Sequence, residues 1–333
     1  MITTERPATK HPTGTSAGRD EPADPASSRH RLVIEHLTKR YGEHSVVDDL
    51  SFTVEPGRIT GFLGPNGSGK STTMKILLDL AAADHGTSTI GGRRYRDLDD
   101  PAGTVGVVLE PNAFHPGRSG RNHLQILAVA TDQPAERVDH TLAAVGLDPR
   151  AARRRVGTYS LGMKQRLSLA GALLTDPPVL ILDEPANGLD PQGIRELRDL
   201  LRARAARGHT VLVSSHLLTE VEHLVDDVVV IDQGRLVTTG TIADLTTGSA
   251  RVRTPGARQL VGLLTAAGGQ VETAGPDTLL VAGLDLERIG DTALAAGIAI
   301  HELSPHAGSL EDVFFALTTP THPTNTTQEV AAS

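Results

Sequence analysis

The chain has 333 residues, of which 38% are apolar, and it carries a formal net charge of -8. This length suits one large domain with a smaller one, or two medium domains, and the negative charge argues against a general nucleic-acid-binding surface. Because the sequence contains no cysteine, disulfides, iron–sulfur clusters and cysteine-ligated zinc are excluded.

The two ends of the chain differ in composition from the rest. Residues 1–30 are rich in Pro, Thr, Ser, Ala and charge, and residues 320–333 have the same character, so both are predicted to be disordered tails. The first tail has no apolar h-region, which argues against a secretory signal. No run approaches the roughly 18 consecutive apolar residues of a membrane-spanning helix. We therefore expect a soluble, cytoplasmic protein.

Between the tails, short apolar strand patterns alternate with amphipathic helical patterns. Strands are predicted over RLVIEHL, DLSFTVE, RITGFL, TVGVVLE, PVLILDE, HTVLVSSH and both halves of DVVVIDQGRLVTTG. Helices are predicted over STTMKILLDLA, residues 120–147, residues 161–175 and residues 193–208. Continuous apolar strands of this kind are typical of a parallel sheet buried on both faces. The pattern predicts an α/β fold over residues 31–244, with a helical region interposed.

A second, smaller unit is predicted after a change of character at residues 248–250. From there the patterns run β-α-β-β-α-β, through stretches such as ARVRT, ARQLVGLLTAAG and IAIHELS. This order indicates a small α+β domain over residues 250–319.

The strongest motif is GPNGSGKST, directly after the apolar run ITGFL. It fits G-x-x-x-x-G-K-[ST], in which glycines let backbone N–H groups form an anion nest at the N-terminus of a helix. Lys70 is expected to neutralise the β- and γ-phosphates, Ser71 to ligate Mg²⁺ and Thr72 to support the α/β-phosphates. The alternative is a chance match in a glycine-rich loop, which the flanking strand and helix disfavour. The predicted triphosphate site comprises Gly64, Pro65, Asn66, Gly67, Ser68, Gly69, Lys70, Ser71 and Thr72.

A pair of carboxylates ends the strand VLILDEP, residues 179–185. Asp183 is predicted to reach Mg²⁺ at the carboxyl edge of the sheet. Glu184 is placed to polarise the attacking water as general base. A strand followed by an acidic turn would have the same pattern without any chemistry, but the phosphate motif favours the catalytic interpretation.

The stretch YSLGMKQRLSLAGALL, residues 159–174, resembles the ABC signature, and residues 31–244 resemble the ATP-binding subunit of an ABC transporter. The resemblance implies a P-loop NTPase fold with a mainly parallel sheet, an antiparallel β subdomain and a helical signature subdomain. Ser160 and Gly162 fall on positions that contact the γ-phosphate held by the other subunit, at a helix N-terminus that can face an anion. An ordinary helix cap is the alternative. Leu161 stands where the family pattern has glycine, a departure that bears on the geometry across the dimer.

Further site residues follow from the resemblance position by position. Tyr41 resembles the aromatic residue that stacks on adenine, although a core or surface tyrosine is the alternative. Asp190 in NGLDP resembles the loop that links the two sites of a dimer, and it is also an ordinary N-cap. His216 matches the switch histidine that touches the γ-phosphate. Glu110 stands where the family usually has glutamine, and a carboxylate can bind Mg²⁺ but cannot donate a hydrogen bond.

The resemblance also implies cofactors and partners. These are ATP with Mg²⁺, a second copy of the chain closing head to tail as a homodimer, and an integral membrane permease; no nucleic acid is expected. The chain would then be peripheral on the cytoplasmic face of the membrane, with the segment after Glu110 facing the permease. GSLEDVFFALT, residues 308–318, resembles the tail of drug- or antibiotic-exporting subunits, which implies export of a drug-like, antibiotic or lipid-like compound. Its apolar stripe packs on the core or contributes to a dimer contact.

Two other classes of protein are alternatives. Non-transport ABC ATPases that act on ribosomes usually hold two cassettes, and those that act on DNA insert long coiled coils before the signature. This chain has one cassette, and residues 73–159 show no sustained heptads. A P-loop GTPase or small-molecule kinase lacks support, because the N-K-x-D guanine motif is absent and SLGMKQR would be unexplained.

Overall fold

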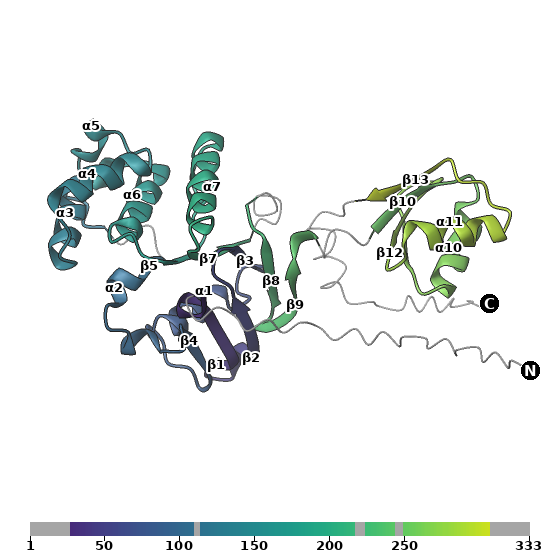
Figure 1. The fold of residues 1–333 in the computed structure, drawn as a ribbon, viewed down its shortest axis with the longest axis horizontal. Helices are drawn as coiled ribbons and strands as arrows, with labels where there is room; N and C mark the ends of the chain where they lie inside the picture. Colours follow the sequence, from purple (N-terminus) through teal and green to yellow (C-terminus); the bar gives the residue numbers. More distant parts are fainter. Residues whose placement is uncertain (1–26, 110–113, 217–223, 244–248, 307–333) are drawn as a thin grey trace, which may run out of the picture.

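The structure is a computed structural model that describes residues 27–109, 114–216, 224–243 and 249–306 (Figure 1). The predictions for Glu110 and the residues just after it, for residues 308–318 and for most of both tails lie outside these ranges. Ser27–His30, at the end of the first predicted tail, forms a short 3-10 turn. The hydroxyl of Thr210 donates to the carbonyl of His30 at 2.6 Å, which ties this turn to the central sheet.

A six-stranded sheet lies at the centre of the described chain, in the order β5-β6-β7-β3-β8-β9. Its strands are β3 (Ile59–Leu63), β5 (Val105–Val108), β6 (Val179–Leu182), β7 (Thr210–Ser215), β8 (Asp227–Asp232) and β9 (Arg235–Thr241). All of these pairings are parallel except that of β8 with β9. Every residue of β3, β6 and β7 is buried, as their continuous apolar sequences predict.

The register of the central strands decides which loops meet. Leu182 at the end of β6 pairs with Val213 of β7, and Leu63 at the end of β3 pairs with Ser215. The residues that follow β3 and β6 therefore leave the same edge of the sheet on either side of the end of β7. This edge carries the predicted catalytic residues.

A smaller antiparallel sheet packs beside the first, in the order β2-β1-β4. Its strands are β1 (Leu32–Tyr41), β2 (His44–Val54) and β4 (His85–Ile90). Together with Phe62 and α1 (Lys70–Leu77), the apolar residues of β1 and β2 form one of the hydrophobic cores. The predicted helix STTMKILLDLA is shorter than expected, because α1 ends at Leu77 and Leu80 beyond it is 67% exposed.

A group of helices lies between β5 and β6 in the chain and to one side of the sheet in Figure 1. The helices of the described chain outside the C-terminal unit are α1, α2 (Pro101–Thr104), α3 (Gly120–Ala130), α4 (Ala135–Ala144), α5 (Pro149–Ala152), α6 (Leu161–Leu173), α7 (Pro191–Ala205) and the 3-10 turns Tyr95–Asp97 and Val156–Thr158. The predicted helix over 120–147 is two helices, because Pro134 has an extended backbone and caps α4. Gly146 follows α4 with a φ of 65°, the left-handed conformation typical of a glycine that ends a helix.

The C-terminal unit has its own sheet and its own hydrophobic core. Its elements are β10 (Ser249–Arg253), α10 (Ala257–Ala266), β11 (Gln270–Thr273), β12 (Thr278–Ala282), α11 (Leu286–Ala295) and β13 (Glu302–His306). They run in the order that the sequence predicts, and the strands form an antiparallel sheet in the order β11-β12-β10-β13. Across the described ranges, no helix combines the length and the apolar character that crossing a membrane requires.

Candidate nucleotide site

The phosphate loop, residues 64–70, joins the carboxyl end of β3 to α1. Gly67 and Gly69 have φ values of 83° and 105°, in the region that glycine adopts without strain. A Cβ on Gly69 would lie 2.5 Å from the carbonyl oxygen of Val46, so the position also lacks room for a side chain. The loop therefore needs glycine both for its backbone and for its close approach to β2.

Lys70 is the first residue of α1, and it is only 6% exposed. Its Nζ donates hydrogen bonds to the carbonyl oxygens of Gly64 at 2.6 Å and Pro65 at 3.1 Å. Burial lowers the pKa of Lys70, and the nearby carboxylates of Glu184 and Asp183 oppose that shift. The loop thus holds a partly desolvated ammonium group at a helix N-terminus, where an anion would be stabilised by both.

Asp183 follows β6 and connects the sheet edge to the phosphate-loop helix. Its Oδ2 accepts a hydrogen bond from the Ser71 hydroxyl at 2.6 Å, and its Oδ1 accepts one from the Ser214 hydroxyl. A serine hydroxyl beside a carboxylate is a set of hard oxygen donors that suits Mg²⁺. No group of three or more His, Cys, Asp or Glu residues in the described ranges is arranged to hold a metal. Phosphate and water oxygens would have to complete the coordination of an ion here.

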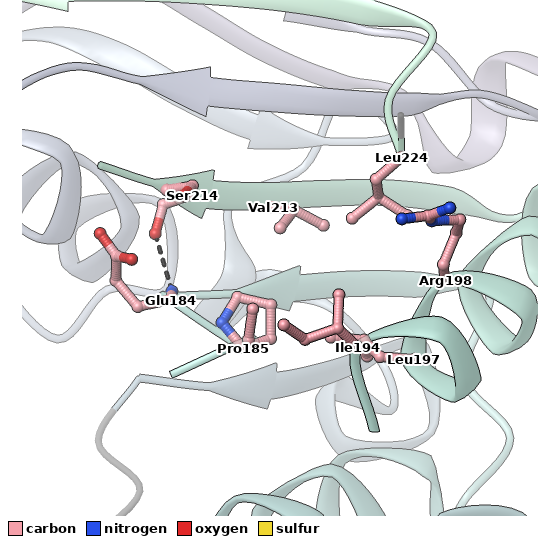
Figure 2. A pocket seen from close by; sticks show the side chains of 10 residues that line it. Glu184, Pro185, Ile194, Leu197, Arg198, Val213, Ser214 and Leu224 are labelled. Carbon is pink, nitrogen blue, oxygen red and sulfur yellow. Dashed lines mark hydrogen bonds between the residues drawn. The ribbon is translucent and has the colours of Figure 1, made fainter. Parts of the chain in front are cut away.

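Glu184 has a left-handed backbone conformation, with a φ of 49°, which is unusual for a residue other than glycine. Its backbone N–H donates to the Ser214 hydroxyl at 2.9 Å (Figure 2). Its Oε2 lies 2.8 Å from Nδ1 of His216. In Figure 2 its carboxyl group extends away from the small pocket behind it, which Val213, Leu197 and Leu224 help to line. The carboxylate and the histidine are thereby held together at the sheet edge.

Ser214 is a residue of this site that the sequence analysis did not single out. It is fully buried on β7, and its hydroxyl bridges Asp183 and the backbone of Glu184. The sequence contained one signal, a polar residue inside the apolar strand HTVLVSSH. This serine can be assigned to the site only once β6 and β7 are known to be neighbouring strands.

The predicted signature residues open α6. The Ser160 hydroxyl caps the helix by accepting from the backbone N–H of Met163 at 3.2 Å, so the ordinary cap is present. A Cβ on Gly162 would lie 2.6 Å from the carbonyl oxygen of Gly188. Leu161, 48% exposed, covers Gly188, where a Cβ would lie 2.5 Å from the leucine Cγ. The start of α6 thus packs against the loop that precedes α7.

Asp190 caps α7 by accepting from the backbone N–H of Gly193 at 2.9 Å. Tyr41 ends β1 and is 54% exposed, so the core alternative for this tyrosine is wrong. Nζ of Lys39 lies 5.2 Å from the centre of its ring. In the described chain, neither Asp190 nor Tyr41 is hydrogen-bonded to the group formed by Lys70, Ser71 and the sheet-edge residues.

A glycine-rich phosphate loop at the carboxyl edge of a parallel sheet is the defining feature of a P-loop NTPase. The sequence profile described as ABC transporter matches residues 47–187, and a profile described as a domain of unknown function (DUF8746) matches residues 248–311. The ABC transporter ATP-binding protein YdbJ of Bacillus subtilis is 36% identical, over 86% of this chain and 95% of its own. The bacitracin transport ATP-binding protein BcrA of Enterococcus faecalis is 41% identical, over 64% of this chain and 70% of its own.

A solved structure of an ATP-binding subunit of an ABC transporter is similar in fold, with a TM-score of 0.59 and 29% identity over 64% of this chain and 91% of that one. The chain belongs to the ABC transporter family of ATP-binding proteins. It is an ATP-binding and ATP-hydrolysing subunit, and the predicted fold class is confirmed. Such subunits of exporters power a separate membrane permease.

Proposed function

We propose that residues 64–72, Asp183, Glu184 and His216 bind Mg-ATP and hydrolyse it. The observation that carries the proposal is one series of contacts at the sheet edge. The series runs from Ser71 to Asp183, Ser214, Glu184 and His216. It joins the helix that follows the phosphate loop to a carboxylate–histidine pair, so a nucleotide bound in the loop would meet both.

Each side chain then has a distinct role. Lys70 and the loop N–H groups would hold the phosphates, and Ser71 and Asp183 would hold Mg²⁺, which when bound would supply neutralising charge for the phosphate oxygens. Glu184 accepts the proton of the attacking water or orients that water. His216, bonded to the Glu184 carboxylate, keeps it aimed at the phosphate end of the site. Tyr41, exposed at the end of β1, provides a face for adenine.

The site is completed by a second copy of the chain. Ser160 and Gly162 of the second copy would meet the γ-phosphate, since Ser160 and Leu161 are exposed at a helix N-terminus that can face an anion. ATP charge is then shared between donors of both copies, and hydrolysis weakens the contact. Asp190, at the N-terminus of α7 beside the signature of its own chain, would link the two sites.

Residues 31–244 act as the ATP-binding domain and residues 250–319 as an accessory domain, between predicted disordered tails. The pair of chains docks on a separate permease at the cytoplasmic face of the membrane. Similarity to the bacitracin transport protein, over 70% of its length, supports export of an antibiotic-like or lipid-like compound. Glu110 would contact Mg²⁺ in place of the usual glutamine.

Substitution of the two central residues tests the site. Glu184→Gln should bind ATP and dimerise, with turnover reduced by about 10²–10⁴-fold, because the amide cannot accept the proton. Lys70→Ala should lose ATP affinity. Glu136→Gln, on an exposed part of α4, is the matched control and should keep both properties. Normal turnover by Glu184→Gln would remove Glu184 from its role, and unchanged ATP binding by Lys70→Ala would contradict the phosphate site.

Purification of the native complex tests the partner. A transporter subunit should co-purify from detergent with an integral membrane protein. The alternative, a non-transport ATPase acting on ribosomes or DNA, predicts co-purification with ribosomes or nucleic acid and no permease.

A further inference from the structure

The turn between β8 and β9 lies directly against the phosphate loop. Its central residues, Gln233 and Gly234, have φ values of 46° and 80°, as in the tight two-residue turns that join antiparallel strands. The N–H of Gly234 donates to the carbonyl oxygen of Ser68 at 3.0 Å, and the carbonyl of Gly234 accepts from the N–H of Asp48 at 2.9 Å. The turn therefore connects the middle of the phosphate loop to β2.

The backbones of the same three segments approach one another closely. A Cβ on Gly234 would lie 2.6 Å from the carbonyl oxygen of Val46, the same oxygen that leaves no room for a Cβ on Gly69. A Cβ on Gly64, at the start of the loop, would collide with the carbonyl oxygen of Ile231 at the end of β8. The loop is thus held between the backbones of β2 and the β8–β9 hairpin.

The hydrogen bond to the Ser68 carbonyl also fixes the direction of the Gly69 N–H, which belongs to the same peptide group. The Ser68 carbonyl and the Gly69 N–H belong to one trans peptide, so they point in opposite directions. Because the carbonyl is directed at Gly234, the Gly69 N–H is directed away from the turn. In a phosphate loop, consecutive N–H groups of this kind are the donors that surround the anion. The turn therefore controls the direction of one donor of the nest.

We propose that the Gln233–Gly234 turn positions the phosphate loop for nucleotide, acting through Ser68 and Gly69 rather than by touching the ligand. The role rests on the proposed function of the loop. An ion pair at 2.6 Å between Asp48 of β2 and Arg235 of β9 further holds the turn against β2.

Two glycine substitutions separate this role from general stability. Gly234→Ala and Gly92→Ala both place alanine at a φ of 80°, but Gly92 has no atom within 4 Å of the added Cβ. Both variants should lose thermal stability through the backbone strain, and Gly234→Ala should lose more because its Cβ also meets the carbonyl oxygen of Val46. Gly234→Ala alone displaces the turn, so its dissociation constant for ATP should rise about tenfold. Its KM should rise in parallel while kcat at saturating ATP stays near that of the unsubstituted protein.

An ATP dissociation constant for Gly234→Ala within twofold of that for Gly92→Ala would overturn the proposal. If Gly234→Ala does not fold, hydrogen exchange in the unsubstituted protein decides the matter. ADP should slow amide exchange in a peptide covering residues 228–241 and leave residues 278–282 of the C-terminal unit unchanged. No slowing in residues 228–241 would overturn the proposal. Loss of ATP binding in Lys70→Ala, with full binding in Gly234→Ala, would reject the positioning role alone and leave the proposed function standing.

Discussion

The hydroxyl oxygen of Ser214 lies 2.9 Å from the backbone nitrogen of Glu184 and accepts its hydrogen bond. The same hydroxyl donates its proton to Asp183, so both of its hydrogen-bonding functions are used. Glu184 has a left-handed backbone that costs about 1 kcal/mol, and the hydrogen bond that its N–H donates to Ser214 helps to offset this cost. The buried Ser214 side chain thereby orients two adjacent acidic residues, Asp183 and Glu184, which have different proposed roles.

Removing this hydroxyl should affect turnover more than binding. Ser214→Ala leaves the Glu184 N–H and one Asp183 oxygen without their partner, and we expect kcat to fall by about tenfold or more. The ATP dissociation constant should change by less than about threefold, because the phosphate loop is untouched. Ser214→Thr, which keeps the hydroxyl, should recover most of the activity. Steady-state kinetics and equilibrium ATP titration measure the two quantities.

Ser304→Ala is the control for this experiment, since Ser304 makes one side-chain hydrogen bond in the C-terminal unit, to Glu302. It should leave kcat unchanged. Equal kcat values for Ser214→Ala and the unsubstituted protein would mean that Glu184 is oriented by other contacts.

Asp176 joins α4 to α7 through three arginines, and this should make stability depend on pH. Its carboxylate lies 2.7 Å from Arg204, 3.1 Å from Arg207 and 3.7 Å from Arg137. Burial alone would raise the pKa of Asp176, but the three guanidinium groups outweigh it and hold the pKa below its ordinary value. A carboxyl group whose pKa is lower in the folded state stabilises the fold above its unfolded pKa, and this contribution is lost as the pH falls through the folded pKa.

Asp176→Asn should therefore lower the free energy of unfolding at pH 7 by about 1–2 kcal/mol, a modest value because Asp176 is about one-third exposed and partly screened. The difference between the two proteins should shrink as the pH falls below about 4. There the carboxyl group of Asp176 binds a proton first in the unfolded chain, and at still lower pH in the folded protein as well. Urea unfolding at a series of pH values measures it. A difference that is constant with pH would show that the charge of Asp176 does not stabilise the fold.

Gln165 should be replaceable with a gain in stability. Its side chain on α6 is completely buried, and among the residues that the structure describes neither its Oε1 nor its Nε2 has a hydrogen-bond partner. An unpaired buried amide costs about 1–3 kcal/mol, so Gln165→Met, of similar length, should raise the free energy of unfolding by about 1 kcal/mol. The half-buried Gln125 on α3 is the control, where the same change should have an effect under about 0.5 kcal/mol. A loss of stability in Gln165→Met would reveal a partner for the amide.

Replacing Arg166 with lysine should destabilise the fold, because the guanidinium group of Arg166 hydrogen-bonds both the C-terminal end of α4 and α7. It donates to the carbonyl of Val145 and to the Glu196 carboxylate, both at 2.7 Å, from a side chain that is 18% exposed. Both bonds come from one guanidinium nitrogen, Nη1, and the lysine side chain is one bond too short to place its ammonium nitrogen at that position. Arg166→Lys should lower the free energy of unfolding by about 1–2 kcal/mol in urea. Full stability in this variant would show that one of the two bonds contributes nothing.

The parts of the site that are local in sequence could be predicted. The phosphate loop needs glycines, a lysine and hydroxyls within nine residues, and Asp183 and Glu184 end a strand whose apolar run is visible. Ser214 and the Gln233–Gly234 turn could not be assigned a role, because their contacts depend on which strands are neighbours. That order comes from packing of the whole sheet, not from any one segment.

The misplaced elements have identifiable physical causes. β4 was not predicted, because HGTSTI has a single large apolar residue, and only one of its six residues is buried. Leu80 was placed on α1, but the chain leaves the helix at Leu78, and Asp79 takes a left-handed conformation with a φ of 54°. A glycine usually marks such an ending, and none is present there.

Leu161 and Gly188 occupy adjoining space, so the side chain at residue 161 restricts which residue fits at position 188. A side chain at residue 188 would enter the space of the leucine, and glycine at residue 161, the usual family residue, would leave that space open. That open space would not by itself make a side chain acceptable at residue 188, because the φ of 77° there strains any residue other than glycine. Homologous sequences that carry a large residue at the first of these positions should consequently keep glycine at the second.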